Sequence, residues 1–422
     1  MRFFGAVSAN NTLRRIFRIA IILIPPALIA ALVVPRVVDV PIFDEWLWAP
    51  LVIHAVDGQL SFAQLWELQN AHRSIVPTFI ALALALISRW DVRWEIVASL
   101  IASVASVVIL TAMLPAARRT SGAVVFSLLL FGTNQIENWT WGFQLSWFIV
   151  NLGTITTAWA LRSPGLSRAL GAIAAASVAS LSLLSGFSAW IAGGIMVIAL
   201  PRRIAATWYL CFGLFSALFF WGYRLPAQER ENLMNAGSLI EIPLSVVTLI
   251  GAPVAAVAGS GVAAIVGVTA IITVIILARS AVWTVAKPWI ALAGAALFAA
   301  AMIAVARSGG GADEMMTSRY ATLGNVFWCA VAGLALESKV REQFLRRGLR
   351  ACAVCAALLW MGSATVGGMS VSGIVGLQHE ELRRLTAAPP LRPADIQDYA
   401  PDPLRAAALV PLLQRRHLTA FR

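Results

Sequence analysis

Residues 262–278 have the sequence VAAIVGVTAIITVIILA, in which no side chain is charged. A helix that crosses the hydrocarbon core of a bilayer needs roughly 20 consecutive apolar residues. Apolar runs of comparable length recur along the whole chain, at residues 19–35, 96–114, 166–184, 204–222, 289–306 and 350–369. This repetition predicts an all-α, polytopic integral membrane protein.

The composition agrees with that fold class. Charged residues make up 12% of the chain and hydrophobic residues 59%, whereas soluble domains carry about 25% charged residues. Arginines at the cytoplasmic ends of membrane helices account for the net charge of +12, so we expect no nucleic-acid partner. The four cysteines, Cys211, Cys329, Cys352 and Cys355, lie in apolar runs, and we expect small buried side chains rather than zinc ligands.

The basic clusters predict a topology, because loops rich in Lys and Arg stay in the cytoplasm. We place six clusters inside: Arg14/Arg15/Arg18, Arg89/Arg93, Arg162/Arg168, Arg202/Arg203, Arg279/Lys287 and the arginines and lysine of residues 337–350. An even number of crossings must then separate neighbouring clusters. Arg118 and Arg119 fall outside in this scheme, as an exception to the bias or as a phosphate-binding pair.

Two segments are expected to be re-entrant or broken. Residues 122–131 are too few to span comfortably, and residues 242–257 contain Pro243, Gly251 and Pro253. Irregular backbone at membrane depth is tolerated only where it is buried in protein or lines a cavity. The scheme then has about eleven crossings plus interfacial and re-entrant helices. It places the N-terminus inside and the C-terminus outside, and we expect a bacterial inner (plasma) membrane, in which these sides are the cytoplasm and the periplasm.

The domain organisation follows from the same pattern. Residues 1–370 form the transmembrane domain, which begins with an uncleaved first helix and has an outer-face first loop over residues 36–74. Residues 371–422 form a short outer-face tail, in which we expect a helix near residues 403–414. The first loop, residues 132–144, residues 307–320 and the tail gather the polar residues on the outer side.

The first outer loop carries Asp44 and Glu45, with Trp46 and Trp48 beside them. A carboxylate at a membrane interface is costly and often marks a functional site. The alternative is a carboxylate pair stabilised by the dipole of a helix that begins there. For the two tryptophans, an aromatic belt at the membrane surface is an equally good interpretation.

The loop continues with Ser61 and Gln64, which form a capping box at the start of an amphipathic helix extending to Arg73. Such a helix lies in the membrane interface. It ends in a dense polar cluster that contains Asn70, His72 and Arg73, just before the second crossing.

Residues 134–144 contain amides, a carboxylate and aromatic rings between two apolar runs. Flat aromatic faces next to hydrogen-bonding groups suit a sugar ring, whose faces are apolar and whose edges carry hydroxyls. The candidate sugar- or acceptor-binding residues are Glu137, Asn138, Trp141 and Gln144, together with Asn70 of the first loop. The alternative is an aromatic belt with a helix cap.

Residues 307–320 contain three consecutive glycines, 309–311, flanked by Arg307 and Arg319. Glycine lets backbone approach a ligand closely, and the planar fork of arginine suits a phosphate. The alternative is a flexible outer loop with solvated charges. No Lys-Ser/Thr pair follows the glycines, so this stretch is not a P-loop.

The acidic pair after the first membrane helix resembles that of the GT-C class of membrane glycosyltransferases, which use polyprenyl-phosphate-linked sugars. The chain is also similar to uncharacterised bacterial membrane proteins that carry four motifs in order. These are Asp-Asp/Glu-Trp, Asn-x-His-Arg, Glu-Asn-Trp-x-Trp-Gly-x-Gln and Ser-Arg-Tyr. Their counterparts here lie at residues 44–46, 70–73, 137–144 and 318–320.

The resemblance implies a GT-C-like enzyme that moves a sugar from a polyprenyl-phosphate donor to an envelope glycan or lipid acceptor on the outer face, with inversion. Asp44 is then the general base, and Glu45 orients it, binds the acceptor or is itself the base. Arg319, Arg73, His72 and Tyr320 are the candidate donor-phosphate residues. A divalent cation, Mg²⁺ or Mn²⁺, is left open as a cofactor. The main alternative is a transporter or flippase for a lipid-linked or anionic substrate; the other is an envelope assembly protein without chemistry.

Overall fold

The computed structural model describes residues 16, 19–20, 22–225, 227–234, 241–307, 310–340, 342–387 and 391–422. Within these ranges every regular element is a helix, as the apolar pattern predicts. The expected features at Arg14, Arg15, Arg18 and Gly309 lie outside the described residues.

Seven helices in the described ranges are long and apolar enough to cross a membrane. They are α5 (Arg93–Met113), α11 (Arg202–Phe220), α13 with η6 (Glu241–Ala258), α14 (Ser260–Ser280), α15 (Trp283–Ala306), η8 with α17 (Ser318–Glu337) and α18 with α19 (Gln343–Leu385). The chain is therefore a multi-helix membrane protein.

Shorter helices complete the bundle. Four of them are apolar: Ile22–Val33, α4 (Ile75–Ser88), α9 (Leu166–Ser180) and Leu184–Val197, which comprises η5 (Leu184–Phe187) and α10 (Ser188–Val197). Two more, α6 (Arg119–Leu130) and α8 (Leu145–Ala160), pack against α5. The twelve residues of α6 are too few to span a bilayer core, in line with the prediction for residues 122–131.

Of the two forms expected for residues 242–257, the broken helix is wrong and the re-entrant segment stays a prediction. Helix α13 (Glu241–Ala255) is continuous and runs on into η6 (Ala256–Ala258). Pro243 lies in its first turn, where proline is tolerated. Gly251 faces α14 so closely that a Cβ would overlap the carbonyl oxygen of Ala263, which is the small-residue packing common between membrane helices.

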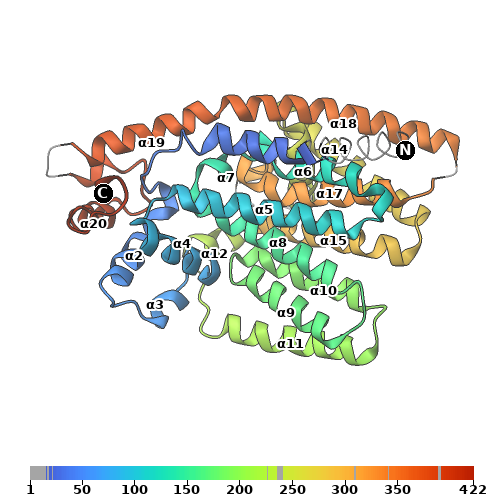
Figure 1. Cartoon of the computed structure of the whole chain (residues 1–422), viewed down its shortest axis with the longest axis horizontal. Coiled ribbons are helices and arrows are strands. Elements are labelled where there is room, and N and C mark those ends of the chain that lie inside the picture. The colour runs from blue at the N-terminus through green and yellow to red at the C-terminus, as the bar shows by residue number, and fades with distance from the viewer. Residues whose placement is uncertain are drawn as a thin grey trace, which may run out of the picture.

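Helices α18 (Gln343–Met369) and α19 (Val371–Leu385) form one long rod along an edge of the molecule (Figure 1), interrupted only at Ser370. At a rise of 1.5 Å per residue the rod is roughly 65 Å long, about twice the thickness of a bilayer core. Cys352 and Cys355 are exposed on α18, so the prediction that they are buried is wrong.

A cap gathers at one end of the bundle (Figure 1). The first loop contributes η1 (Phe43–Leu47), α2 (Ala49–Val56) and α3 (Phe62–Trp66), and the tail contributes η9 (Pro393–Asp395), α20 (Pro403–Arg415) and η10 (Thr419–Phe421). Buried side chains from both segments form one hydrophobic cluster. Helix α20 confirms the expected helix near residues 403–414.

The Ser61–Gln64 capping box is present, but α3 ends at Trp66. The amphipathic helix expected to reach Arg73 is therefore wrong. After Glu67 the chain makes a tight turn, closed by paired backbone hydrogen bonds between Gln69 and His72.

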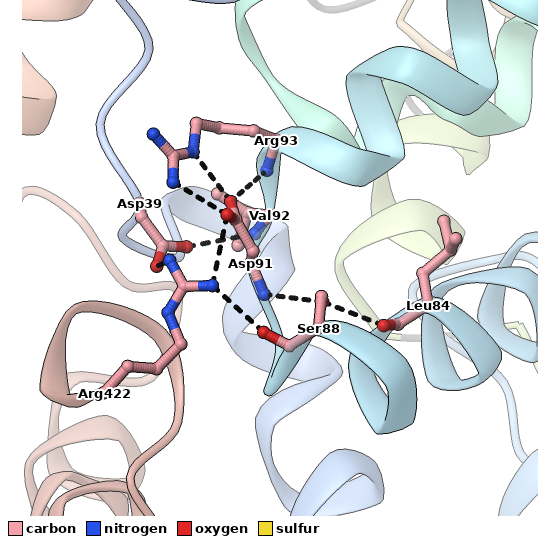
Figure 2. Close-up of polar contacts among 7 residues, drawn as sticks. All are labelled: Asp39, Leu84, Ser88, Asp91, Val92, Arg93 and Arg422. Carbon is pink, nitrogen blue, oxygen red and sulfur yellow. Dashed lines mark hydrogen bonds and ion pairs between the residues drawn. The ribbon is translucent and has the colours of Figure 1, made fainter.

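Figure 2 shows how the tail fastens to the first loop. The Arg422 guanidinium lies 2.5 Å from Asp39 and 3.1 Å from Asp91. Arg93 forms a two-pronged pair with Asp91, at 2.8 and 2.7 Å, and the Val92 amide donates to Asp39. We call these residues, Asp39, Asp91, Arg93 and Arg422, the tail clasp.

The tail clasp overturns part of the predicted topology. Arg89 and Arg93 lie at the cap end, since Thr419 donates its amide hydrogen to the Arg89 carbonyl. The other end of α4 is also tied to the cap, through Gln69, which bridges Thr78 and Trp48. The two ends of α4 thus lie at the same end of the bundle, and it is not the second crossing we expected.

Arg119 also differs from its predicted place. It lines a cavity together with Arg162 and Arg168, so all three arginines share one end of the bundle. Arg119 therefore lies on the same side as Arg162 and Arg168, and its predicted place on the opposite side is wrong.

Candidate functional site

The turn that carries the acidic pair sends its two carboxyl groups to different places. Phe43 has a φ of 49°, a backbone conformation that costs a bulky residue on the order of 1 kcal/mol or more. Its amide donates to the Tyr399 carbonyl of the tail at 2.6 Å, and its ring packs edge-on against Trp141. These contacts hold η1 so that Asp44 is half-buried and Glu45 is buried.

Glu45 is a linking residue. Its carboxylate accepts amide hydrogens from Ile42 at 2.9 Å and Phe143 at 3.1 Å, and also from Gly142. Burial raises its pKa to about 8, although the three amide bonds act in the opposite direction. Glu45 joins the first loop to residues 142–144 and is only 1% exposed, which favours Asp44 over Glu45 as the residue that meets a substrate.

Asp44 faces a group of polar side chains. Burial raises its pKa above the usual value, while a hydrogen bond from Asn70 and the charges of Arg319 and Arg307 oppose that rise. Asn70 sits in the tight turn with a φ of 54°, which asparagine tolerates better than most residues. The turn therefore presents the Asn70 amide to Asp44.

The Ser-Arg-Tyr motif, residues 318–320, lies against residues 134–144. Arg319, on η8 (Ser318–Tyr320), approaches Glu137 of α7 (Ile136–Thr140) at 3.5 Å. The Glu137 amide donates to the Ser318 hydroxyl, and the Arg319 carbonyl accepts from Asn138. The Arg319 and Glu137 side chains are 30% and 24% exposed, so an approaching ligand can reach both.

The structure thus brings together one residue from each of the four motifs. Asp44, Asn70, Glu137 and Arg319 lie in one patch at the cap end, and Arg307, at the end of α15, lies beside it. Arg307 also approaches Glu314 at 3.7 Å. We call these four motif residues the outer cluster. It places a carboxyl group of raised pKa, that of Asp44, near the guanidinium of Arg319, which is 3.5 Å from Glu137.

Several predicted site residues hold the outer cluster in place. Trp141 donates its indole N–H to the Ile42 carbonyl, and Asn138 bonds Thr322 as well as Arg319. Gln144 is 3% exposed and Tyr320 also 3%. All four are buried, so their predicted contacts with a sugar, an acceptor or a phosphate are not available in this conformation.

Arg73 and His72 occupy structural positions. The guanidinium of Arg73 donates to the carbonyls of Trp66, Phe219 and Trp221 at 2.6–2.9 Å and stacks over the Trp66 ring. Burial lowers the pKa of His72 to about 4, so it is neutral at pH 7. Arg73 thus fastens the loop to the end of α11, and His72 supplies no positive charge.

The tryptophans of the first loop do not form a belt facing lipid. Trp46 is 4% exposed and donates its indole N–H to Glu381, while Trp48 is fully buried and donates to Gln69. His54 pairs with Gln64 of the capping box at 2.7 Å. These rings are part of the core of the cap.

Two sets of residues escaped the sequence analysis. One is the part of a buried polar network formed by Asn151, Thr322 and Asn325, which join the amides of Asn134 and Gln135 behind the outer cluster. The other comprises two buried carboxyls, Glu95 in the apolar helix α5 and Glu381 in the amphipathic helix α19. A carboxyl inside an apolar helix is costly and suggests function, and that signal could have singled out Glu95. Glu381 lies among the charged residues of 379–384, so no such signal marks it in the sequence.

The donor set does not fit the divalent cation left open above. In the part of the chain that the structure describes, no group of three or more His, Cys, Asp or Glu side chains is arranged to hold a metal ion. The outer cluster offers the carboxylates of Asp44 and Glu137, and Arg319 approaches Glu137. We assign no step to a metal.

We compared the chain with protein families, curated proteins and solved structures. No protein-family model, no curated protein and no solved structure matches the chain. The outer cluster is therefore the feature of the molecule that bears on its function.

Proposed function

We propose that the protein is a GT-C-like membrane glycosyltransferase that takes its sugar from a polyprenyl-phosphate donor at the periplasmic face. The observation that supports this best is the outer cluster, in which a half-buried carboxylate of raised pKa lies near a partly exposed arginine at one end of an apolar bundle. A base and a phosphate-binding cation are the two groups that such a transfer requires.

In the proposed reaction Asp44 takes the proton of an acceptor hydroxyl. The acceptor oxygen attacks the anomeric carbon from the face opposite the phosphate, and the bond from that carbon to the phosphate oxygen breaks. The polyprenyl phosphate leaves with the electron pair, and Arg319 stabilises its charge. A phosphate leaves readily as an anion, so the mechanism needs no second acid.

The surrounding residues support these roles. The Asn70 amide orients the Asp44 carboxylate, and Glu137 holds Arg319 through an ion pair long enough, at 3.5 Å, to yield to a phosphate. Glu45 acts through position alone, because its oxygens bond backbone amides. The transporter alternative loses the support of a discontinuous helix, since α13 is unbroken.

The test is transfer from labelled polyprenyl-phosphate sugars by the purified protein in lipid nanodiscs. Asp44→Ala should lower turnover about 100- to 10,000-fold, the usual contribution of a general base. Asp57→Ala is the matched control: Asp57 belongs to the same loop but pairs with Arg416 on the cap surface, so this variant should keep wild-type turnover.

Arg319 provides a second arm. Arg319→Gln should raise the donor KM, and Arg319→Lys should recover part of that loss because it keeps the charge without the planar fork. Full activity in Asp44→Ala would refute the base assignment. Movement of the intact donor across vesicles by the wild type, without sugar transfer, would favour the transporter.

A further inference from the structure

A second polar site lies at the other end of the bundle from the outer cluster. A cavity of about 440 Å³ opens where α5 ends, α6 begins, α8 ends and α9 begins. Its polar wall consists of Arg119, Arg162, Arg168 and Ser163, and Trp159 and Pro115 line the rest. These residues come from two separate helix junctions, α5–α6 and α8–α9, so only the tertiary structure brings them together.

The charge of this cavity is unbalanced. Among the residues that the structure describes, no carboxylate lies within ion-pair distance of Arg119, Arg162 or Arg168. The charge of Glu337 attracts Arg162 at longer range, and the charge of Arg119 repels Arg162. Glu337 is itself held by the indole N–H of Trp289 at 3.2 Å. Three positive charges therefore face one cavity with a single distant acid.

Two of the guanidinium groups are fixed to the cavity wall. Arg162 donates one N–H to the Ala112 carbonyl at 3.3 Å, and Arg119 donates one to the Leu114 carbonyl at 3.1 Å. A guanidinium has five N–H donors, so most of these donors remain for a ligand. The bonds to carbonyls set the direction of each group before a ligand arrives.

Two of the arginines lie at the start of a helix, which adds an electrostatic cost when no anion is bound. Arg119 is the first residue of α6, and Arg168 lies in the first turn of α9. Positive charge at the start of a helix opposes the helix dipole. A bound anion would offset both this cost and the mutual repulsion of the arginines.

We propose that this cavity binds a phosphate-bearing anion, held by Arg119, Arg162 and Arg168. The planar fork of arginine matches two phosphate oxygens at once, and Ser163 adds a hydroxyl. The apolar side of the cavity includes Trp159, which is 38% exposed. The phosphate can come from an anionic phospholipid headgroup or from a soluble phosphate ester.

The test compares two probes on the purified full-length protein. Phosphatidylglycerol in nanodiscs of otherwise zwitterionic lipid is scored by the lipid retained in native mass spectrometry. Inorganic phosphate and glycerol phosphate are scored by their effect on thermal unfolding in detergent. Each arginine changed to glutamine should weaken binding about fivefold, the equivalent of ~1 kcal/mol per charge.

The matched controls are Arg202→Gln and Arg203→Gln. Both residues are exposed and begin α11, whose other end is tied to Arg73, so they lie at the same end of the bundle but outside the cavity. Arg162→Lys keeps the charge and should lose less than Arg162→Gln.

Loss of phosphatidylglycerol in the cavity variants alone supports a lipid headgroup. Stabilisation by glycerol phosphate or inorganic phosphate, lost in the same variants, supports a soluble phosphate ester. Equal loss in the cavity and control variants would show a diffuse positive surface and overturn the proposal, as would failure of the wild type to bind either probe.

Discussion

Glu45 is a charged type of residue that usually lies at the surface, but here it is buried and has a structural role. Its carboxylate joins two loops, because it accepts hydrogen bonds from the backbone amides of Ile42 and Phe143. Its neighbour Asp44 points toward Asn70 and the arginines instead. Adjacent residues of similar chemistry thus divide into a positioning residue and a candidate base because the strained turn at Phe43 sends them to opposite sides.

The raised pKa of Glu45 predicts how stability depends on pH. Its usual value is 4.5, and burial raises it to about 8. Between these values the folded state holds a proton that the unfolded chain has released, so stability should fall as pH rises from about 4.5 to about 8 and then level off. The loss is on the order of 1.4 kcal/mol per pKa unit, or several kcal/mol at most.

Thermal unfolding of the wild type and Glu45→Gln across this pH range measures the effect. The variant should show a flatter slope and lower stability at acidic pH, since an amide cannot accept on both sides. Asp39, whose pKa burial raises to about 6, adds a slope of the same sign in both proteins. Glu67→Gln, at an exposed position in the same loop, is the control. Equal slopes in all three would contradict the prediction.

At the scale of elements, the contact between α13 and α14 explains why Gly251 lies in an unbroken helix. Gly251 and Gly267 face each other's helices, and a Cβ on either would overlap a backbone carbonyl of the partner helix. Proline and glycine in an apolar run suggested a break, yet here they serve a close helical contact.

Gly251→Ala should destabilise the protein by about 1–3 kcal/mol, the usual cost of forcing extra atoms into a packed contact. Gly261→Ala is the matched control, since a Cβ at Gly261, on α14, meets nothing within 4 Å. Alanine also favours the helix there, so the control should be neutral or slightly stabilising. The comparison is made by thermal unfolding in detergent, and equal effects of the two substitutions would contradict the proposed contact.

At the scale of the whole molecule, the first loop and the tail form one cap although more than 300 residues separate Asp39 from Arg422. Backbone and side-chain bonds join them at several points, including Phe43 to Tyr399 and Trp46 to Glu381. The tail therefore helps to hold the turn that carries Asp44.

Arg422→Gln should loosen this cap. The change leaves Asp39 and Asp91 facing each other with only Arg93 between them, and we expect a loss of about 1–3 kcal/mol because a buried carboxylate loses its partner. Limited proteolysis should cut the tail near α20 sooner than in the wild type.

Arg392→Gln provides the comparison, since the Arg392 side chain is 75% exposed in its pair with Asp395 and such pairs contribute about 0–1 kcal/mol. In a double-mutant cycle, Arg422→Gln combined with Asp39→Asn should cost less than the sum of the single changes. Strict additivity would mean that the tail clasp does not couple the two segments.

The sequence by itself determined the helical membrane character of the chain, because an apolar run of roughly 20 residues has the length of a helix that crosses a bilayer core. It also singled out Asp44, Asn70, Glu137 and Arg319, because polar groups at the ends of apolar runs are costly unless they have a purpose. The sequence could not decide at which end of the bundle Arg93 or Arg119 lies. A charge pattern assigns a residue to one side of the membrane only if the number of crossings before it is known.

Only the tertiary structure decided which of these residues meet. It separated Asp44 from Glu45, assigned Arg73 and Trp141 to backbone carbonyls, and joined Arg119 with Arg162 and Arg168 in one cavity. Such outcomes depend on contacts between segments far apart in the chain. No local pattern encodes them, because hydrogen bonding and burial are properties of the assembled neighbourhood and not of the residue alone.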